Sequence, residues 1–307
     1  MLEHFFSVEG DKSIFDGLKI SKDKKLCEEY MGKHPVISIS LKGINAASYE
    51  AAFELTVKTI KGAVQKAGFL KMSDKLDEDE KKEYRAILDE NMSEATLFWS
   101  LKNLSELLEK HYETKVILLI DEYDVPLAKA FENGYYDKMV FLIRNLLEQT
   151  LKTNNSLKFA VMTGCMRISK ESIFTGLNNL KVLSITDERF DEYFGFTDED
   201  VKEMLRYYDR EDHYEEMRNW YDGYRFGSTD VYCPWDVLNH CDKIKENAAA
   251  FPENYWVHTS SNEAVKKIIQ MSGNITTKRE IERLLAGEEI VKEIRQELTC
   301  LLYTSDA

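Results

Sequence analysis

The sequence predicts an α/β fold, a parallel sheet with helices on both faces, followed by a mostly helical region. Residues 116–120 form an unbroken aliphatic run, Val-Ile-Leu-Leu-Ile. Such a run is typical of a strand buried on both faces, as in a parallel sheet under helices. Strand-like segments also alternate with helix-length segments over roughly the first 190 residues, and this alternation indicates a parallel sheet rather than hairpins.

The individual elements follow from periodicity and from start and stop signals. Strand-like segments cover residues 35–41, 116–121, 157–163 and 181–186. Helical periodicity or a helix start signal marks residues 1–7, 46–69, 94–111, 135–152, 197–208 and the segment from Pro234. Residues 73–93 are dense in charge, so we expect a solvated helix or loop there. We expect the stretch up to about residue 299 to be mostly helical.

Composition limits the class of protein. The chain has 307 residues, is 43% hydrophobic and 31% charged, and has only four prolines, which is a soluble globular composition. A net charge of −14 argues against a general nucleic-acid or membrane-surface binder. Its apolar runs are shorter than the ~20 residues that span a bilayer. Five cysteines without C-x-x-C spacing favour free thiols, so we expect a cytoplasmic location.

Acidic residues at the end of the aliphatic run are the first candidates for chemistry. Asp121 and Glu122 follow it directly, and Asp124 comes next. Parallel sheets bind ligands at the carboxyl ends of their strands. Nucleotide hydrolases use such an edge to hold Mg²⁺ and to polarise the attacking water. We therefore assign Asp121 to Mg²⁺, Glu122 to the water and Asp124 to a turn or cap. The alternative is a capped strand end with solvated carboxylates.

The next strand supplies two further candidates. Thr163 ends it and Arg167 follows shortly after, so both would lie beside the acidic edge, within reach of a γ-phosphate. Alternatively, Thr163 caps the strand and Arg167 is a surface cation. Residues 220–227 are rich in aromatic side chains and predict either a lid over an adenine ring or a small second core with Arg225 stacked on it.

A phosphate-binding loop is missing from these 307 residues. The motif G-x-x-x-x-G-K-[ST] would wrap the phosphates with backbone amides and a lysine. The Gly-Lys pair in the chain, Gly32-Lys33, has Cys27 in place of the first glycine and His34 in place of the Ser/Thr. The histidines show no H-E-x-x-H pattern, so a zinc site is not expected.

Several segments together resemble the predicted AAA-ATPase-like family of bacteria, in which a P-loop domain precedes a nuclease-like domain of the PD-(D/E)XK type. The order and spacing of these segments agree over residues 1 to about 300. The matching segments are Met1-Leu-Glu-His-Phe-Phe, His34-Pro-Val-Ile, Leu119-Ile-Asp-Glu-Tyr-Asp-Val-Pro, Met162-Thr-Gly, Ile173-Phe-Thr-Gly-Leu-Asn-Asn, Trp220-Tyr-Asp-Gly-Tyr and Asn254-Tyr-Trp.

The resemblance implies a truncated P-loop NTPase of the AAA-like type that uses ATP and Mg²⁺ in its full-length form. Asp121 would be the Mg²⁺-binding acid of the Walker B strand, Glu122 the catalytic acid and Thr163 the polar sensor. The assignment of Arg167 to phosphate binding is a weaker inference from the resemblance. Residues 1–190 would be the ATPase core without its first strand and phosphate loop. Residues 191–300 would be a helical lid region, and residues 301–307 look like a sequencing-adapter scar.

Three functional hypotheses follow. The first is a piece of an ATPase that is inactive by itself and poorly stable, because two strands would lack ladder partners. The second is a non-catalytic interaction module of degenerate P-loop fold. The third, a hydrolase using the carboxylates directly, ranks last because Asp121 and Glu122 would point to opposite faces of a strand. The expected partner is a nucleotide. Nucleic acid is a possible partner only through the nuclease-like domain of the family, and no membrane contact is expected.

Overall fold

The computed structural model describes residues 1–89, 91–165 and 180–256, together with positions 279, 282, 283, 286, 288 and 290. The described residues form two compact units that divide between Leu180 and Lys181. The first unit contains a three-stranded sheet and the second a two-stranded hairpin. In this described part of the chain, no helix is long and apolar enough to cross a membrane.

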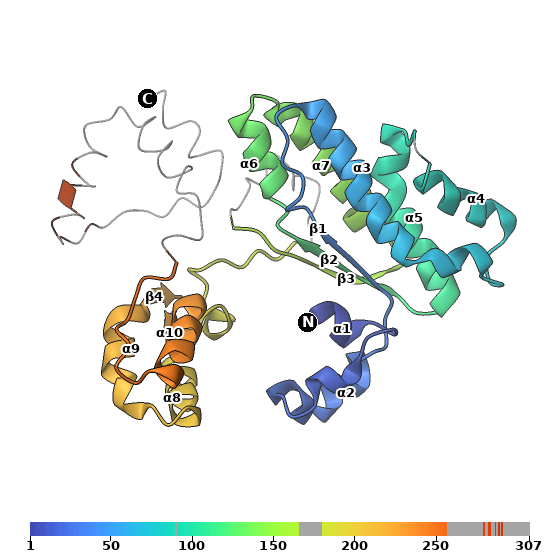
Figure 1. Cartoon of the computed structure of the whole chain (residues 1–307). Coiled ribbons are helices and arrows are strands. Elements are labelled where there is room, and N and C mark those ends of the chain that lie inside the picture. Colours follow the sequence, from blue (N-terminus) through green and yellow to red (C-terminus); the bar gives the residue numbers. More distant parts are fainter. Residues whose placement is uncertain are drawn as a thin grey trace. The chain divides into compact units, whose positions relative to one another are not determined.

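The sheet of the first unit is parallel, with the strand order β1-β2-β3 (Figure 1). Its strands are β1 (Val36–Ser40), β2 (Val116–Asp121) and β3 (Leu157–Met162). Ser40 lies opposite Asp121, and Ile120 lies opposite Met162. The three strands therefore end at one edge, and the predicted α/β class with a parallel sheet is confirmed.

Five helices cover one face of this sheet or extend from it. They are α3 (Tyr49–Lys66), α4 (Glu78–Ile87), α5 (Glu94–Tyr112), α6 (Val125–Glu132) and α7 (Tyr136–Lys152). The side chains of Ser48 and Ser93 accept hydrogen bonds from the first turns of α3 and α5. These caps explain why the helices begin where the sequence changes from loop to apolar periodicity.

The main core lies between the sheet and these helices. Side chains alternate across a strand, so Ile37 and Ile39 of β1 face the same side as Leu118 and Ile120 of β2. All four are buried. They pack with the apolar faces of the helices in one continuous cluster, which is the burial that the aliphatic run of β2 predicts.

The charged segment 73–93 contributes more to this core than the sequence predicts. Asp77 and Glu80 form a capping box that starts α4. Tyr84 and Ile87 on the inner face of α4 are fully buried. The Tyr84 hydroxyl donates a hydrogen bond to the carbonyl oxygen of Val64 at 2.9 Å. The segment is thus an amphipathic helix whose charged side alone is solvated.

The N-terminal helices lie on the other side of the sheet (Figure 1). They are α1 (Leu2–Phe6) and α2 (Lys24–Tyr30), joined by 3-10 turns at Lys12–Phe15 and Lys19–Lys22. The ring centroid of Phe159 in β3 is 5.5 Å from that of Phe6 and 6.4 Å from that of Tyr30. Aromatic packing therefore covers this face near the start of β3, and the predicted helix at residues 1–7 is confirmed.

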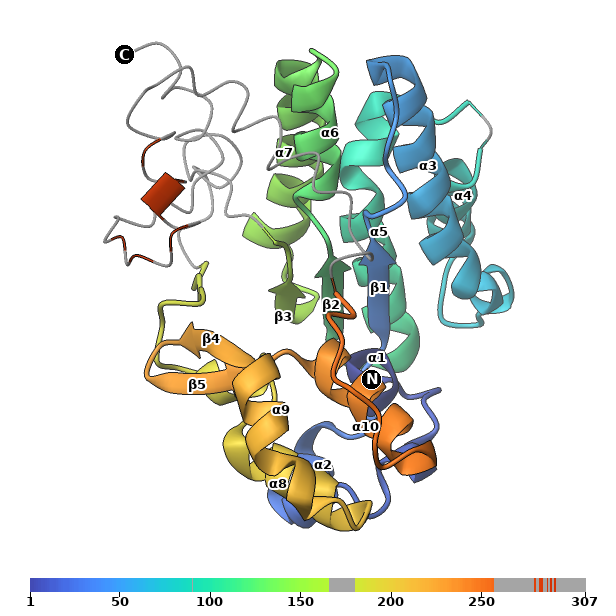
Figure 2. The same cartoon turned by 60° about the vertical axis from the view of Figure 1, so that its left-hand side comes forward.

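The second unit combines helices with a hairpin (Figure 2). Its elements are α8 (Asp198–Tyr207), α9 (Tyr214–Tyr221), β4 (Asp222–Phe226), β5 (Thr229–Tyr232) and α10 (Pro234–Glu246), with 3-10 turns at Asp191–Tyr193 and Glu211–His213. Thr197 and Asp200 form the capping box of α8. The small core holds Val201, Leu205, Met217, Tyr221, Tyr232, Val237, Cys241 and Ile244.

Asp198 joins three elements of this unit. Its Oδ1 accepts hydrogen bonds from the hydroxyls of Tyr214 at 2.8 Å and Tyr232 at 2.9 Å. Its Oδ2 lies 2.6 Å from the ammonium of Lys202. Burial by itself would raise the pKa of Asp198, but these hydrogen bonds outweigh burial and lower that pKa.

Two local expectations in the second unit are wrong. Residues 181–186 do not form a strand. Residues 222–226 form β4 of an antiparallel hairpin, and Trp220 and Tyr224 are about half exposed, so within the described region these rings do not form the expected core with a stacked Arg225. Arg225 instead lies 3.3 Å from Asp230 across the hairpin. The second core uses other residues, of which Tyr221 belongs to the predicted cluster.

Candidate functional site

The acidic edge of the sheet is built by a sharp change of backbone direction after β2. Asp121 is the last residue of β2, and Glu122 has a left-handed backbone with φ of +54°. That conformation costs a residue with a side chain about 1–2 kcal/mol. Pro126 then stands in the first turn of α6, where its missing N–H is tolerated. The strand therefore ends at Asp121, and the backbone changes direction at Glu122.

Thr163 joins the ends of β2 and β3. Its hydroxyl donates a hydrogen bond to Oδ1 of Asp121. Its amide donates to the carbonyl of Ile120 at 2.9 Å, and its carbonyl accepts from the amide of Tyr123 at 3.1 Å. The structure thus brings together two of the residues predicted for the site, and it fixes their backbone as well as their side chains.

Glu122 faces a different environment from Asp121. Its Oε1 lies 3.5 Å from the Nζ of Lys42, which follows β1, and the Lys42 side chain is 77% exposed. Such an exposed pair contributes about 0–1 kcal/mol. Its Oε2 is buried and, among the described residues, accepts no hydrogen bond. A buried carboxylate oxygen in that position is suited to accept a hydrogen bond from a water molecule or a ligand.

Asp124 is the N-cap residue of α6, as the sequence predicts for a turn or cap. It is 3% exposed, and its carbonyl accepts the amides of Leu127 and Ala128. Gly164 of the neighbouring strand end packs directly against it. A Cβ on Gly164 would lie 2.6 Å from Oδ1 of Asp124 and 2.8 Å from the ring of Tyr123. The close approach leaves no room for a side chain at this position.

The pKa of the Cys165 thiol shows which charges dominate this edge of the sheet. Burial raises the pKa of its thiol, and the negative charges of Asp124, Glu122 and Asp121 raise that pKa further, whereas Lys42 lowers it. Acidic groups therefore dominate the local field. Carboxylate and hydroxyl oxygens in a negative field are the ligands that Mg²⁺ prefers, so Asp121 and Thr163 fit a hard cation. Arg167 lies outside the described residues, as does the matching segment that begins at Ile173.

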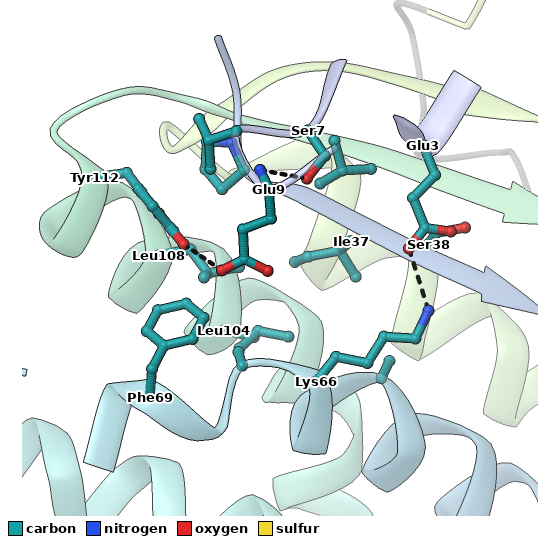
Figure 3. A pocket seen from close by; sticks show the side chains of 15 residues that line it. Glu3, Ser7, Glu9, Ile37, Ser38, Lys66, Phe69, Leu104, Leu108 and Tyr112 are labelled. Carbon is teal, nitrogen blue, oxygen red and sulfur yellow. Dashed lines mark hydrogen bonds and ion pairs between the residues drawn. The ribbon is translucent and has the colours of Figure 1, made fainter. Parts of the chain in front are cut away.

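A pocket in the first unit lies elsewhere. It has a volume of about 90 Å³ and is lined by α1, the start of β1, α3 and α5 (Figure 3). Glu3 pairs with Lys66 at 3.2 Å on one side, and Glu9 accepts the hydroxyl of Tyr112 at 2.8 Å on the other. Ligand pockets are typically about 300–1,000 Å³. This pocket is too small for a nucleotide and does not include the acidic edge.

A further group of side chains escaped the sequence analysis. His213, Glu216 and His240 bring one potential ligand atom each to a common point in the second unit. Its sequence signal is the i, i+3 spacing of His213 and Glu216, which puts both on one side of a helix start. The sequence gives no signal for the third member, because His240 is far along the chain and the histidines show no H-E-x-x-H pattern.

Comparison with known proteins gives the class. Residues 1–174, more than half of the chain, match the model of a family described as "Predicted AAA-ATPase". The chain belongs to this family. The resemblance stated from the sequence segments is thereby confirmed for the ATPase part, while the nuclease-like domain stays a prediction.

The chain is also similar to the "Uncharacterized protein in vnfD 5'region" of Azotobacter chroococcum mcd 1. The two are 33% identical over 137 residues, which cover 40% of this chain and 24% of that protein. The match therefore spans about a quarter of the relative. No solved structure matches.

Proposed function

We propose that this chain is part of an ATP-binding, Mg²⁺-dependent ATPase of the AAA-like P-loop class. Membership of the family supports the class. The observation that carries the site is the contact between Asp121 and Thr163 at the carboxyl edge of a parallel sheet, next to Glu122 with its left-handed backbone. Nucleotides bind at this edge in open α/β sheets.

The residues divide the work as follows. Asp121 holds Mg²⁺, directly or through water, and Thr163 fixes the orientation of that carboxylate. Glu122 accepts a proton or hydrogen bond from the attacking water through its buried Oε2. Thr163 and Arg167 would lie near the γ-phosphate. When bound, Mg²⁺ held by Asp121 would supply positive charge that neutralises the charge developing on the phosphates.

We place the phosphate loop outside residues 1–307. Gly32 and Lys33 do not form one. The amide of Gly32 donates a hydrogen bond to the carbonyl oxygen of Phe5 at 2.8 Å, and Gly32 is packed against the side chain of Lys12. Among the described strands, β3 pairs with β2 alone. The same holds for β1 among these described strands, so two outer edges are open to a further strand. Because Thr163, the expected sensor residue, follows β3, the family resemblance favours the edge of β3 for the strand that leads to a phosphate loop. We expect the 307-residue chain by itself to be inactive.

The test is ATP turnover by the natural protein that contains these residues, with and without Mg²⁺. Glu122→Gln should lower kcat by about 10²–10⁴-fold, because a positioned base is lost. Asp121→Asn should raise the Mg²⁺ concentration needed for half-maximal turnover. The matched control is Glu132→Gln, an exposed glutamate on α6 whose partner is Lys129. Wild-type turnover in Glu122→Gln would refute the assignment.

A second candidate is a non-catalytic interaction module of degenerate P-loop fold. The absence of a phosphate-loop motif within the 307 residues favours it. It predicts that the natural protein and its Glu122→Gln variant bind their partner equally well, and that neither form hydrolyses ATP. The same turnover assay therefore separates the two candidates.

A further inference from the structure

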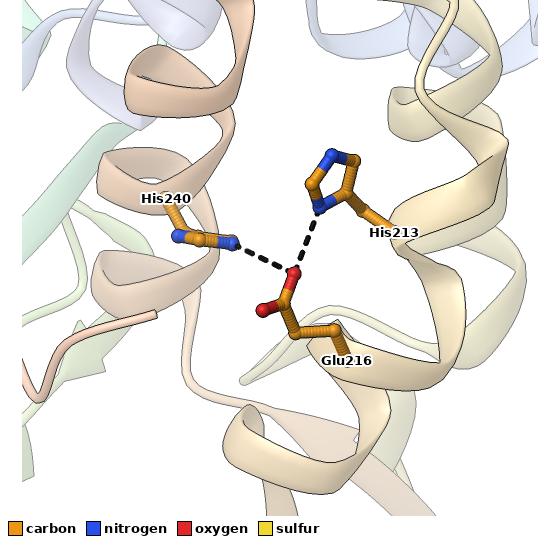
Figure 4. A group of neighbouring side chains, drawn as sticks. All are labelled: His213, Glu216 and His240. Atoms are coloured by element: carbon orange, nitrogen blue, oxygen red, sulfur yellow. Dashed lines mark hydrogen bonds and ion pairs between the residues drawn. The ribbon is translucent and has the colours of Figure 1, made fainter. Parts of the chain in front are cut away.

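Three titratable side chains of the second unit converge on one point (Figure 4). His213 ends the 3-10 turn Glu211–His213, Glu216 lies in the first turn of α9, and His240 lies on α10. Nδ1 of His213 is 2.8 Å from Oε2 of Glu216. Nε2 of His240 is 3.8 Å from the same oxygen. The potential ligand atoms all lie within 4.8 Å of one another.

The two histidines of this cluster are buried, and most of their ring nitrogens lack a hydrogen-bond partner among the residues that the structure describes, which is uncommon for polar side chains in a protein core. His240 is fully buried and His213 is 8% exposed. Within the described part of the chain, neither ring nitrogen of His240 has a hydrogen-bond partner, and the same holds for Nε2 of His213. Buried polar groups in proteins are nearly always hydrogen-bonded or bound to an ion or water. The unpartnered Nε2 of His240 points at Glu216, toward the centre of the group (Figure 4).

We propose that His213, Glu216 and His240 bind a divalent transition-metal ion, with Zn²⁺ as the expected class. Two imidazoles and one carboxylate form a ligand set that suits zinc. Three protein ligands leave one tetrahedral position for water or for a further ligand. The site belongs to the second unit and is independent of the proposed nucleotide site.

The distances agree with this ion. Zn²⁺ lies about 2.0–2.2 Å from nitrogen and oxygen ligands, so neighbouring ligand atoms in a tetrahedron are about 3.3 Å apart. The two separations from Oε2 of Glu216, 2.8 Å and 3.8 Å, lie on either side of that value. The ligand atoms all lie within 4.8 Å of one another, so binding of Zn²⁺ requires the rings to draw closer together.

The cluster has access to solvent on one side. Glu216 is a third exposed, so an ion would have a path to solvent on the side of that carboxylate.

A metal here would join three elements that are otherwise held by a small core. The 3-10 turn and α9 come from one stretch of chain, and α10 follows the hairpin. Met217, next to Glu216, and Cys241, next to His240, are both in the buried core of this unit. A bound ion would therefore stabilise the native second unit and raise its unfolding midpoint as the ion concentration rises.

The experiment titrates the metal-stripped 307-residue chain with Zn²⁺ in competition with a chromogenic chelator, and separately with Co²⁺. Wild type should bind one Zn²⁺ per chain, and Co²⁺ should give the intense visible bands of a tetrahedral ion. Glu216→Gln should weaken Zn²⁺ binding by more than about 100-fold, beyond the 10–100-fold loss known for residues that only orient a ligand. The matched control, Glu215→Gln, changes an exposed glutamate on the same helix and should bind as wild type does.

A second measurement needs no variant. Nitrogen-15 spectra of the wild-type histidine rings should show that His213 and His240 change tautomer and shift on adding Zn²⁺, whereas His4, exposed on α1, does not. The proposal is overturned if wild type binds no Zn²⁺ at micromolar concentration, if Glu216→Gln binds as tightly as Glu215→Gln, or if the two ring signals do not respond.

Discussion

Gly164→Ala tests whether the strand end beside the acidic edge is as tightly packed as the structure shows. The new Cβ would lie 2.6 Å from Oδ1 of Asp124 and 2.8 Å from the ring of Tyr123. Contacts this short force one of the neighbours to move. Asp124 is buried as the N-cap residue of α6, so it has little freedom to do so.

The magnitude follows from the cost of overpacking. Adding a methyl group to a filled site typically costs about 1–3 kcal/mol, and we expect a loss in this range. The comparison variant is Gly62→Ala. Gly62 lies inside α3 on the exposed side, and a Cβ there would meet no atom within 4 Å. Alanine stabilises a helix interior by about 0.5–1 kcal/mol relative to glycine. The same chemical change should therefore have opposite signs at the two positions.

Urea unfolding of the 307-residue chain, followed by far-UV circular dichroism, measures both effects. Because most of the helices among the described residues lie in the first unit, we expect the signal to report chiefly on that unit. Gly164→Ala should lower the midpoint without changing the slope, and Gly62→Ala should raise it. If Gly164→Ala were as stable as wild type, the close approach of Gly164 to Asp124 would be wrong, and with it the described geometry of the site.

Three further predictions concern single hydrogen-bonded groups. Thr163→Val keeps the shape of the side chain but removes the bond to Asp121; it should cost about 0.5–1.5 kcal/mol in urea unfolding, and an unchanged midpoint would show that the bond is absent in solution. Thr197→Ala removes the cap of α8 and should cost about 0.5–2 kcal/mol, seen as faster hydrogen exchange in the amides of α8; equal exchange rates would contradict the cap. Because the pKa of Asp198 is lowered on folding, its contribution is present above the unfolded-state value of about 3.9 and is lost as pH falls through the lower folded-state value. The second unit should therefore lose stability below about pH 4, and Asp198→Asn should flatten that part of the pH profile; identical profiles would refute this role.

Much of the first unit is predictable from local pattern. The aliphatic run of β2 can only be buried on both faces, so its strand and the parallel class follow from the sequence. The helix starts at Ser48, Ser93 and Thr197 are also predictable from the sequence, because a capping side chain and an amphipathic period act over a few residues. The positions of Asp121, Glu122 and Thr163 at one edge follow in turn from the topology of a parallel sheet.

The features that the sequence did not predict depend on contacts between distant segments. Segment 73–93 is charged on average, and the packing of Tyr84 against Val64 shows only in three dimensions. The segment 181–186 has the composition of a strand, but β-propensity is decided by pairing with neighbours, and in the structure this segment pairs with no strand among the described residues. The histidine–glutamate group could not be predicted, because its third member comes from a helix beyond the hairpin.

The sequence by itself determined the class of fold, the family and the sheet edge that carries Asp121, Glu122 and Thr163, because hydrophobic periodicity and strand-end chemistry are local. Only the tertiary structure decided that the hydroxyl of Thr163 binds Asp121, that Glu122 has a left-handed backbone, and that His240 lies close to His213 and Glu216. Those relations depend on side chains brought together by packing between distant segments, and no short-range pattern encodes such distances.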